Sequence, residues 1–184
     1  MSRTLLLVFA FASLVTAAED AKAGLPVTVI GESASPCWTP SGWMGETAFI
    51  TYEAAWPTNP HSGATCAKCM YKKSDGWGGI VWQSPGNDWG DKTGGWNLSD
   101  ATRLIVWARG EEGGEEVTFS FGLIGTDKPF HDSAKGSTKV TLTRDWQPYE
   151  IPLAGKDLHH IKTGFCWTVA GKAATFYLDD VRWE

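Results

Sequence analysis

Short strand-like runs recur along this chain, and their spacing constrains the fold more than any other feature. The runs are rich in β-branched and aromatic residues, begin roughly every 10 to 15 residues, and are separated by Gly, Pro, Asn and Asp. They are expected at 25–30, 48–53, 65–72, 78–83, 103–109, 116–123, 138–143, 149–153, 161–169 and 175–183. No segment keeps a 3.6-residue apolar period, so any helix is short. The pattern predicts one all-β domain, a sandwich or a barrel.

Alternation within a strand indicates which side chains share a face. In the run 103–109, Leu104, Val106 and Ala108 form an apolar set typical of a core. Trp107 and Arg109 fall on the opposite face, and an indole beside a guanidinium suits a surface that meets solvent or ligand.

The first 18 residues are typical of a secretory signal peptide. Arg3 gives a positive start, the apolar run 5–15 is too short to span a bilayer, and 16–18 are the small residues that signal peptidase requires. We therefore expect a secreted protein, extracellular or periplasmic, whose residues 19–184 form a single domain, expected to be a monomer. No other apolar run approaches membrane length, so no membrane partner is expected.

The charge balance argues against polyanionic partners. Without Arg3, 15 basic residues stand against 21 acidic ones, a formal net charge of 15 − 21, about −6. Nucleic acids and anionic membranes both require a basic surface, so neither is expected as a partner.

Four cysteines lie in the predicted mature domain, namely Cys37, Cys66, Cys69 and Cys166. An even number in an oxidising compartment predicts two structural disulfides, with three possible pairings. Free buried thiols are the alternative. A haem motif would need His after the second Cys of the CxxC, and that residue is Met70.

The stretch 77–109 carries five of the eleven tryptophans, and seven glycines at 76–95 break it into short pieces. Indole rings usually lie in a core or at a recognition site. Since not all five can be core, part of this stretch is predicted to bind a flat ligand with an apolar face and polar edges, such as a sugar ring. The candidate ligand-binding residues are Trp77, Trp82, Gln83, Asn87, Asp88, Trp89, Trp107 and Arg109. We expect one platform centred on Trp107 and Arg109, with the residues at 83 and 87–89 at its edge.

Several motifs, in this order, are similar to those of a known group. They are PHSG at 60–63, WNLSDA at 96–101, WQPYEIPL at 146–153, GFCW at 164–167 and FYLDDV at 176–181. Together they resemble carbohydrate-binding modules with a galactose-binding-like jelly-roll fold, from about residue 60 onward. The resemblance implies an antiparallel jelly-roll β-sandwich of two packed sheets. It also implies a non-catalytic module that binds a poly- or oligosaccharide, on which a separate glycan-degrading enzyme would act.

The same resemblance implies a structural calcium ion. In that group an ion commonly links the first strands to the last, and an Asp of the last strand and carbonyls near a Ser-Gly turn are typical ligands. Here the corresponding residues are Asp179 or Asp180, the carbonyls of Ser62 and Gly63, and Glu53. The alternative is that the Asp pair only caps an exposed edge.

Catalysis is disfavoured, so we expect a protein that is not an enzyme. Glycoside hydrolysis needs two carboxylates across a cleft, and the acidic pairs of EEGGEE at 111–116 are most simply a solvated hairpin loop. There is no G-x-S-x-G elbow, and the four histidines lack metal-ligand spacing. A small glycan-active enzyme and an extracellular protein-interaction or adhesion sandwich remain as alternatives.

Overall fold

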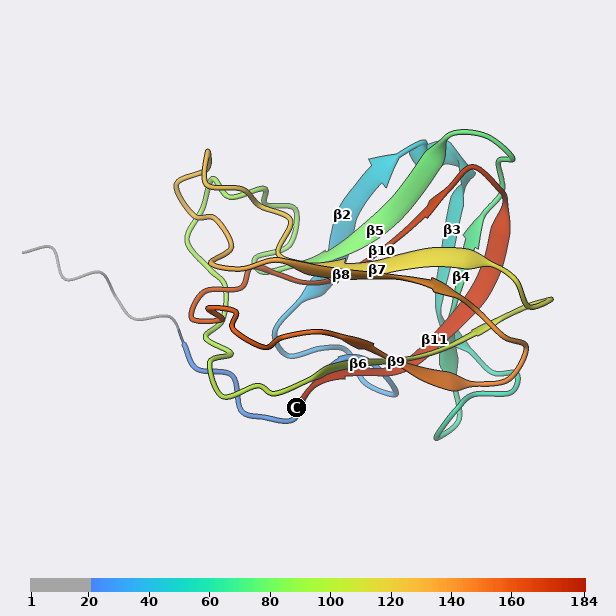
Figure 1. Ribbon diagram of the computed structural model, residues 1–184, viewed down its shortest axis with the longest axis horizontal. Helices are drawn as coiled ribbons and strands as arrows, with labels where there is room; N and C mark the ends of the chain where they lie inside the picture. Colours follow the sequence, from blue (N-terminus) through green and yellow to red (C-terminus); the bar gives the residue numbers. More distant parts are fainter. Residues whose placement is uncertain (1–20) are drawn as a thin grey trace, which may run out of the picture.

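The computed structural model describes residues 21–184, which form two stacked antiparallel sheets (Figure 1). The strands are β1 (Val27–Ile30), β2 (Thr39–Gly45), β3 (Ile50–Trp56), β4 (Cys66–Tyr71), β5 (Trp77–Gln83), β6 (Leu104–Gly110), β7 (Glu116–Phe121), β8 (Gly136–Thr141), β9 (Gln147–Ile151), β10 (Thr163–Ala170) and β11 (Ala174–Trp183). Within the described residues the only helical element is η1 (Thr47–Phe49), a single 3-10 turn.

The order of the strands defines two sheets. The first sheet runs β3-β4-β11-β6-β9, with β1 paired to β11, and the second sheet runs β2-β5-β10-β7-β8. Consecutive pairs such as β5 and β6 belong to different sheets, so long connections cross between the layers and gather at one end of the molecule (Figure 1). The predicted all-β antiparallel sandwich is confirmed.

Every run predicted from the sequence becomes a strand, but β2 was not expected. Its sequence TPSGWMG lies within a stretch rich in Pro, Ser and Gly, a composition typical of a loop. β2 is an edge strand, where the missing N–H of Pro40 does not break a ladder, and a bulge between Pro40 and Gly42 shifts the register by one residue.

The core lies between the sheets and is built from aromatic side chains. Trp82, Trp167 and Trp183 are at most 1% exposed, and the Trp167 ring meets Phe176 edge to face at 5.1 Å. Each buried indole removes about 200 Å² from water, which stabilises the fold by about 5 kcal/mol as an upper bound. This core leaves the outer faces of the sheets as the places where function can reside.

The four cysteines are buried and free, so the prediction of two disulfides is corrected. Cys66 and Cys69 are three residues apart on β4, so their side chains point to opposite faces of the first sheet. Cys166 lies on β10 in the second sheet, and the sheets of a sandwich are ~10 Å apart, beyond the reach of a disulfide from the far side. Burial raises the pKa of the Cys37 and Cys66 thiols to about 11 and that of Cys166 to about 12.

The predicted signal peptide lies outside the described residues. Among residues 21–184, no helix has the length and hydropathy needed to cross a membrane. Secretion therefore stays a prediction.

Candidate functional site

The residues predicted to form one platform lie on opposite faces of the sandwich. Trp107 and Arg109 are on β6, on the outer face of the first sheet. Gln83 ends β5 in the second sheet, and a Cβ added at Gly42 of β2 would lie 3.0 Å from the ring of Trp89. The connection 84–103 crosses between the sheets, which alternation within one strand cannot reveal. The single platform is therefore corrected to two separate surfaces.

On the outer face of the first sheet, the protein covers its own aromatic rings. The His61 ring stacks on Trp107, with 3.7 Å between centroids and an interplanar angle of 19°. Arg109 is only 8% exposed, and its guanidinium lies 3.8 Å from the centroid of the Tyr177 ring. A cation over a ring is stabilised most when it is desolvated, as here. One face of the Trp107 ring is therefore covered by His61, and the Arg109 guanidinium lies against Tyr177.

The Asp pair of β11 holds the turn that precedes β4. Asp179 is 1% exposed, and its Oδ2 accepts hydrogen bonds from the backbone N–H of His61 (3.0 Å) and of Ser62 (3.1 Å). Its Oδ1 accepts the N–H of Asp180 at 2.8 Å. Burial raises the pKa of Asp179, although these hydrogen bonds oppose that shift. The carboxylate therefore already has three N–H donors.

The other side chains predicted to bind calcium, those of Asp180 and Glu53, do not complete an oxygen cage. The Asp180 Oδ2 lies 2.7 Å from the His61 Nδ1, and Glu53 is exposed on β3. At Gly63, a Cβ would meet the Glu32 side chain at 2.5 Å, so this carboxylate fills the space beside the turn. Calcium requires six to eight oxygen ligands. Among residues 21–184 no group of three or more His, Cys, Asp or Glu could hold a metal, so these side chains alone do not fit calcium.

On the outer face of the second sheet, two tryptophans are open to solvent. Trp77 is 46% exposed and Trp89 38% exposed. A Cβ at Gly45 would lie 2.9 Å from the Trp77 ring, as one at Gly42 would lie 3.0 Å from the Trp89 ring. Each indole thus lies against a glycine of β2. Among the described residues, none of the ring–ring or cation–ring contacts involves either indole.

The other predicted ligand residues of this region have structural roles. Trp82 is 1% exposed in the core and meets Tyr52 edge to face at 5.5 Å. Gln83 is 1% exposed, and its Nε2 donates to the carbonyl oxygen of Asp88 at 2.8 Å. Asn87, with φ of 58°, is exposed beside Trp89. Trp77, Asn87 and Trp89 are therefore the predicted ligand residues that the structure leaves open on this face.

Asp88 is buried at 4% exposure and forms an ion pair with Lys162, 2.6 Å from Oδ2 to Nζ. Burial raises the pKa of Asp88, but the Lys162 hydrogen bond and those from Gly90 and Asp91 outweigh it, and the net shift is downward. Sequence reasoning missed Lys162, because a single lysine in HHIKTG carries no pattern that distinguishes a buried cation from an exposed one.

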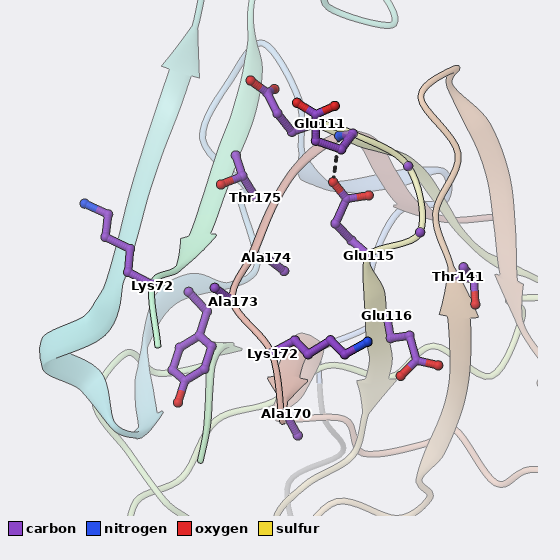
Figure 2. A pocket seen from close by; sticks show the side chains of 14 residues that line it. Lys72, Glu111, Glu115, Glu116, Thr141, Ala170, Lys172, Ala173, Ala174 and Thr175 are labelled. Atoms are coloured by element: carbon purple, nitrogen blue, oxygen red, sulfur yellow. Dashed lines mark hydrogen bonds between the residues drawn. The ribbon is translucent and has the colours of Figure 1, made fainter. Parts of the chain in front are cut away.

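A cavity of about 720 Å³ lies at the other end of the sandwich, beside the acidic hairpin 111–116 (Figure 2). Each glutamate of that hairpin has at least one partner, although the Oε2 of Glu115 is buried without a hydrogen bond. Glu111 accepts from the Tyr177 hydroxyl at 2.6 Å, and Glu115 accepts the N–H of Glu112 at 2.8 Å. Lys139 pairs with Glu116 at 3.1 Å. The cavity does not present two unpartnered carboxylates for acid–base chemistry.

Comparison with known proteins places the fold among carbohydrate-binding modules. The family 30 module of a cellulosomal cellulase of Clostridium thermocellum gives a TM-score of 0.59 at 19% identity, over 87% of this chain and 97% of that one. The family 11 module of another Clostridium thermocellum cellulosomal cellulase gives 0.61 at 14% identity, over 88% and 95%. A family 11 module from the same organism, solved in complex with a β-1,3-1,4-mixed-linked tetrasaccharide, gives 0.58 at 14% identity, over 88% and 96%.

At these identities the likeness establishes a shared β-sandwich fold, and the resemblance inferred from the sequence motifs is confirmed at that level. No family model matches the sequence, and neither does any curated protein.

Proposed function

We propose that this protein is a non-catalytic carbohydrate-binding module that holds a poly- or oligosaccharide on the outer face of its second sheet. The observation that carries the proposal is the pair Trp77 and Trp89, exposed on one face, each against a glycine of β2. A fold shared with carbohydrate-binding modules supports the same conclusion.

The chemistry of the face suits a sugar chain. An indole stacks on the apolar face of a pyranose, while hydroxyl and amide groups bind its polar edges. Thr118, Ser120 and Thr168 are half-buried on the neighbouring strands β7 and β10, and Asn87 is exposed beside Trp89. These groups supply hydrogen bonds without charge.

The separation of the two indoles favours an extended ligand. Trp77 begins β5, and Gly42, which the Trp89 ring approaches, pairs with Val81, four residues further along the same face of β5, which corresponds to roughly 13 Å along a strand. A single sugar ring cannot reach both indoles, but an oligosaccharide can. With two stacking rings and a few hydrogen bonds, we expect a Kd from micromolar to millimolar, roughly −8 to −4 kcal/mol.

No catalytic step is part of this function, because the acidic hairpin holds its glutamates in hydrogen bonds and ion pairs of their own. A separate glycan-degrading enzyme would act on the same polysaccharide. Export would require removal of residues 1–18, and mass spectrometry of the mature chain checks whether it begins at residue 19.

The test is affinity gel electrophoresis against soluble polysaccharides, including a mixed-linked β-1,3-1,4-glucan. The Trp77→Ala/Trp89→Ala variant should lose retention on every polysaccharide that slows the wild type, with an unchanged melting temperature. Trp43→Ala is the matched control, because Trp43 is 42% exposed on β2 but pairs with Ile80, so its register places it on the inner side of the sheet.

Two results would contradict the proposal. The first is a wild-type protein that no polysaccharide retards. The second is a double variant that migrates like the wild type, which would move the site elsewhere. If Trp43→Ala abolished retention as well, the edge of the sandwich rather than the face of the second sheet would be the site.

A further inference from the structure

Lys162 is a fully buried cation immediately before β10. The residue is 0% exposed, and its Nζ donates to the Asp88 Oδ2 at 2.6 Å and to the backbone carbonyl of Lys92. Removing two charges from water costs several kcal/mol per ion before their attraction offsets it, so a buried pair is weak grounds for stability alone. What such a pair does provide is a fixed position for whatever carries the partner charge.

The partner charge lies beside one of the two exposed indoles. The Asp88 carboxylate also accepts the backbone N–H groups of Gly90 (3.2 Å), Asp91 (3.2 Å) and Lys92 (3.1 Å). The chain from 88 to 92 is thus wrapped around the carboxylate. Trp89 lies within this turn, so the position of its backbone depends on the place where Asp88 is held.

A second loop is attached at the same point of β10. The Asp132 carboxylate accepts the N–H of Lys162 (2.6 Å), the N–H of Thr163 (3.0 Å) and the N–H of Ile124 (2.9 Å). The N–H of Phe130 donates to the carbonyl of Gly90 at 3.1 Å. Lys162 therefore joins the loop 84–95, through its side chain, to the loop 122–135, through its backbone.

We propose that Lys162 is a positioning residue of the carbohydrate site, which holds the loop 84–95 so that the Trp89 ring lies against Gly42. This inference rests on the proposed function. The ammonium serves as a built-in cation that fixes the turn around Asp88. An apolar side chain of similar length would fill the same space but leave the Asp88 carboxylate without its counter-ion, and the turn would open toward water.

A double-mutant cycle separates positioning from general destabilisation. Affinity for the mixed-linked β-1,3-1,4-glucan, or for whichever panel polysaccharide the wild type binds, is measured for Lys162→Met, Trp89→Ala and Trp77→Ala and for both double variants with Lys162→Met. Lys162→Met should lose about tenfold, as Trp89→Ala does, which corresponds to one stacked ring. In the Trp89→Ala background, Lys162→Met should cause no further loss of affinity, because residues that act together are not additive. In the Trp77→Ala background it should cause its full loss.

The control for removing a lysine is Lys22→Met. Lys22 pairs with Asp100 at the surface, and the two side chains are 60% and 62% exposed. This variant should bind like the wild type. If Lys162→Met does not fold, Asp88→Asn removes the same ion pair with little change of shape and takes its place in the cycle. The positioning role is overturned if Lys162→Met lowers the affinity equally in the Trp89→Ala and Trp77→Ala backgrounds. It is also overturned if Lys162→Met alone leaves the affinity unchanged.

Hydrogen exchange distinguishes a failure of this inference from a failure of the proposed function, because it needs no glycan. Peptides that cover 84–95 should exchange faster in Lys162→Met than in the wild type or Lys22→Met, while peptides of β6 and β11 keep their protection. If no polysaccharide binds but the loop is loosened, the function fails and the positioning role of Lys162 stands for that loop. If the loop exchanges as in the wild type, the inference fails whatever the glycan data show.

Discussion

The two outer faces of the sandwich both carry aromatic rings, but the rings are covered on one face and open on the other. On the first sheet, His61 covers Trp107, Arg109 covers Tyr177, and Lys68 lies 3.9 Å from the centroid of the Trp56 ring. On the second sheet, Trp77 and Trp89 lie against glycines and no cation covers them within residues 21–184.

The difference teaches that the neighbours of a ring, more than its place on an outward face, decide whether it can bind a ligand. A cation on an adjacent strand at the paired position occupies the ring face, as Arg109 does by pairing with Tyr177 across β6 and β11. A glycine at the neighbouring position supports one side of the ring and leaves the other side open. The first face is closed and serves stability, whereas the second is open and suits recognition.

The largest expected effect comes from opening the closed face. Trp107→Ala removes a half-buried ring and the surface on which His61 stacks, and should lower the free energy of unfolding by about 3 kcal/mol. Urea unfolding measures this, and polysaccharide retention should not change. His61→Ala, which removes only the stacking partner, should cost about 1 kcal/mol. A stable Trp107→Ala protein that no longer binds polysaccharide would return the site to the first sheet.

A smaller effect is expected from closing the open face. In Gly42→Ala the new Cβ would lie 3.0 Å from the Trp89 ring and equally close to Gln83 and Val81, so the ring must shift. We expect about a fivefold loss of polysaccharide affinity, ~1 kcal/mol, in titration calorimetry. Gly86→Ala is the control, since its nearest neighbour would be at 3.4 Å, an ordinary contact. Equal affinities for the two variants would mean that the Trp89 ring does not contribute.

The fold could be predicted from the sequence further than the site could. Alternation assigned the core face of β6 correctly, because burial of Leu104, Val106 and Ala108 depends on the strand itself. The edge strand β2 was missed, since Pro40 and Gly42 carry the composition of a loop. Edge strands tolerate these residues, so local composition does not identify them.

For the site, the sequence identified the two exposed indoles but placed Trp89 beside Trp107 and Arg109, which lie on the other sheet. Trp77 and Trp89 were recognised from their glycine-rich surroundings, which are a local property. The covering of Trp107 by His61 is a contact between residues 46 positions apart, and the pairing of Asp88 with Lys162 spans 74. Contacts over such separations follow from the order of strands in the sheets, which no local pattern contains.

A change in pH should alter the free energy of unfolding in opposite directions through Asp88 and through Asp179. The pKa of Asp88 is lowered in the folded state, so its stabilising contribution is present above the unfolded value of 3.8 and is lost as the pH falls through the lower, folded value. The pKa of Asp179 is raised, first by burial, so its contribution is present below 3.8 and is lost as the pH rises through the higher, folded value.

Unfolding curves between pH 2.5 and about 6 test this pair. Asp88→Asn should remove part of the wild-type loss of stability in acid, whereas Asp179→Asn should remove part of the loss that accompanies rising pH. The Asp157→Asn variant is a useful reference, because the Asp157 pKa is lowered by an exposed histidine contact rather than by a buried ion pair. Parallel pH profiles for Asp88→Asn and Asp179→Asn would show that the opposite shifts are wrong.

The smallest expected effect is that of a chelator, which should leave the melting temperature unchanged. A calcium ion that binds only the folded protein would add about 2.7 kcal/mol at a hundredfold excess over its Kd, a shift of several degrees for a chain of this size. The Asp179 carboxylate already accepts three backbone N–H groups. Their hydrogens carry partial positive charge, so a calcium ion would have to displace them to reach the carboxylate oxygens. Asp179→Ala should therefore lower stability equally with and without EDTA, because it releases the turn at 61–62 from β11 in both buffers. A wild-type protein that melts several degrees lower in EDTA, with Asp179→Ala insensitive to the chelator, would instead show that the turn rearranges to bind calcium.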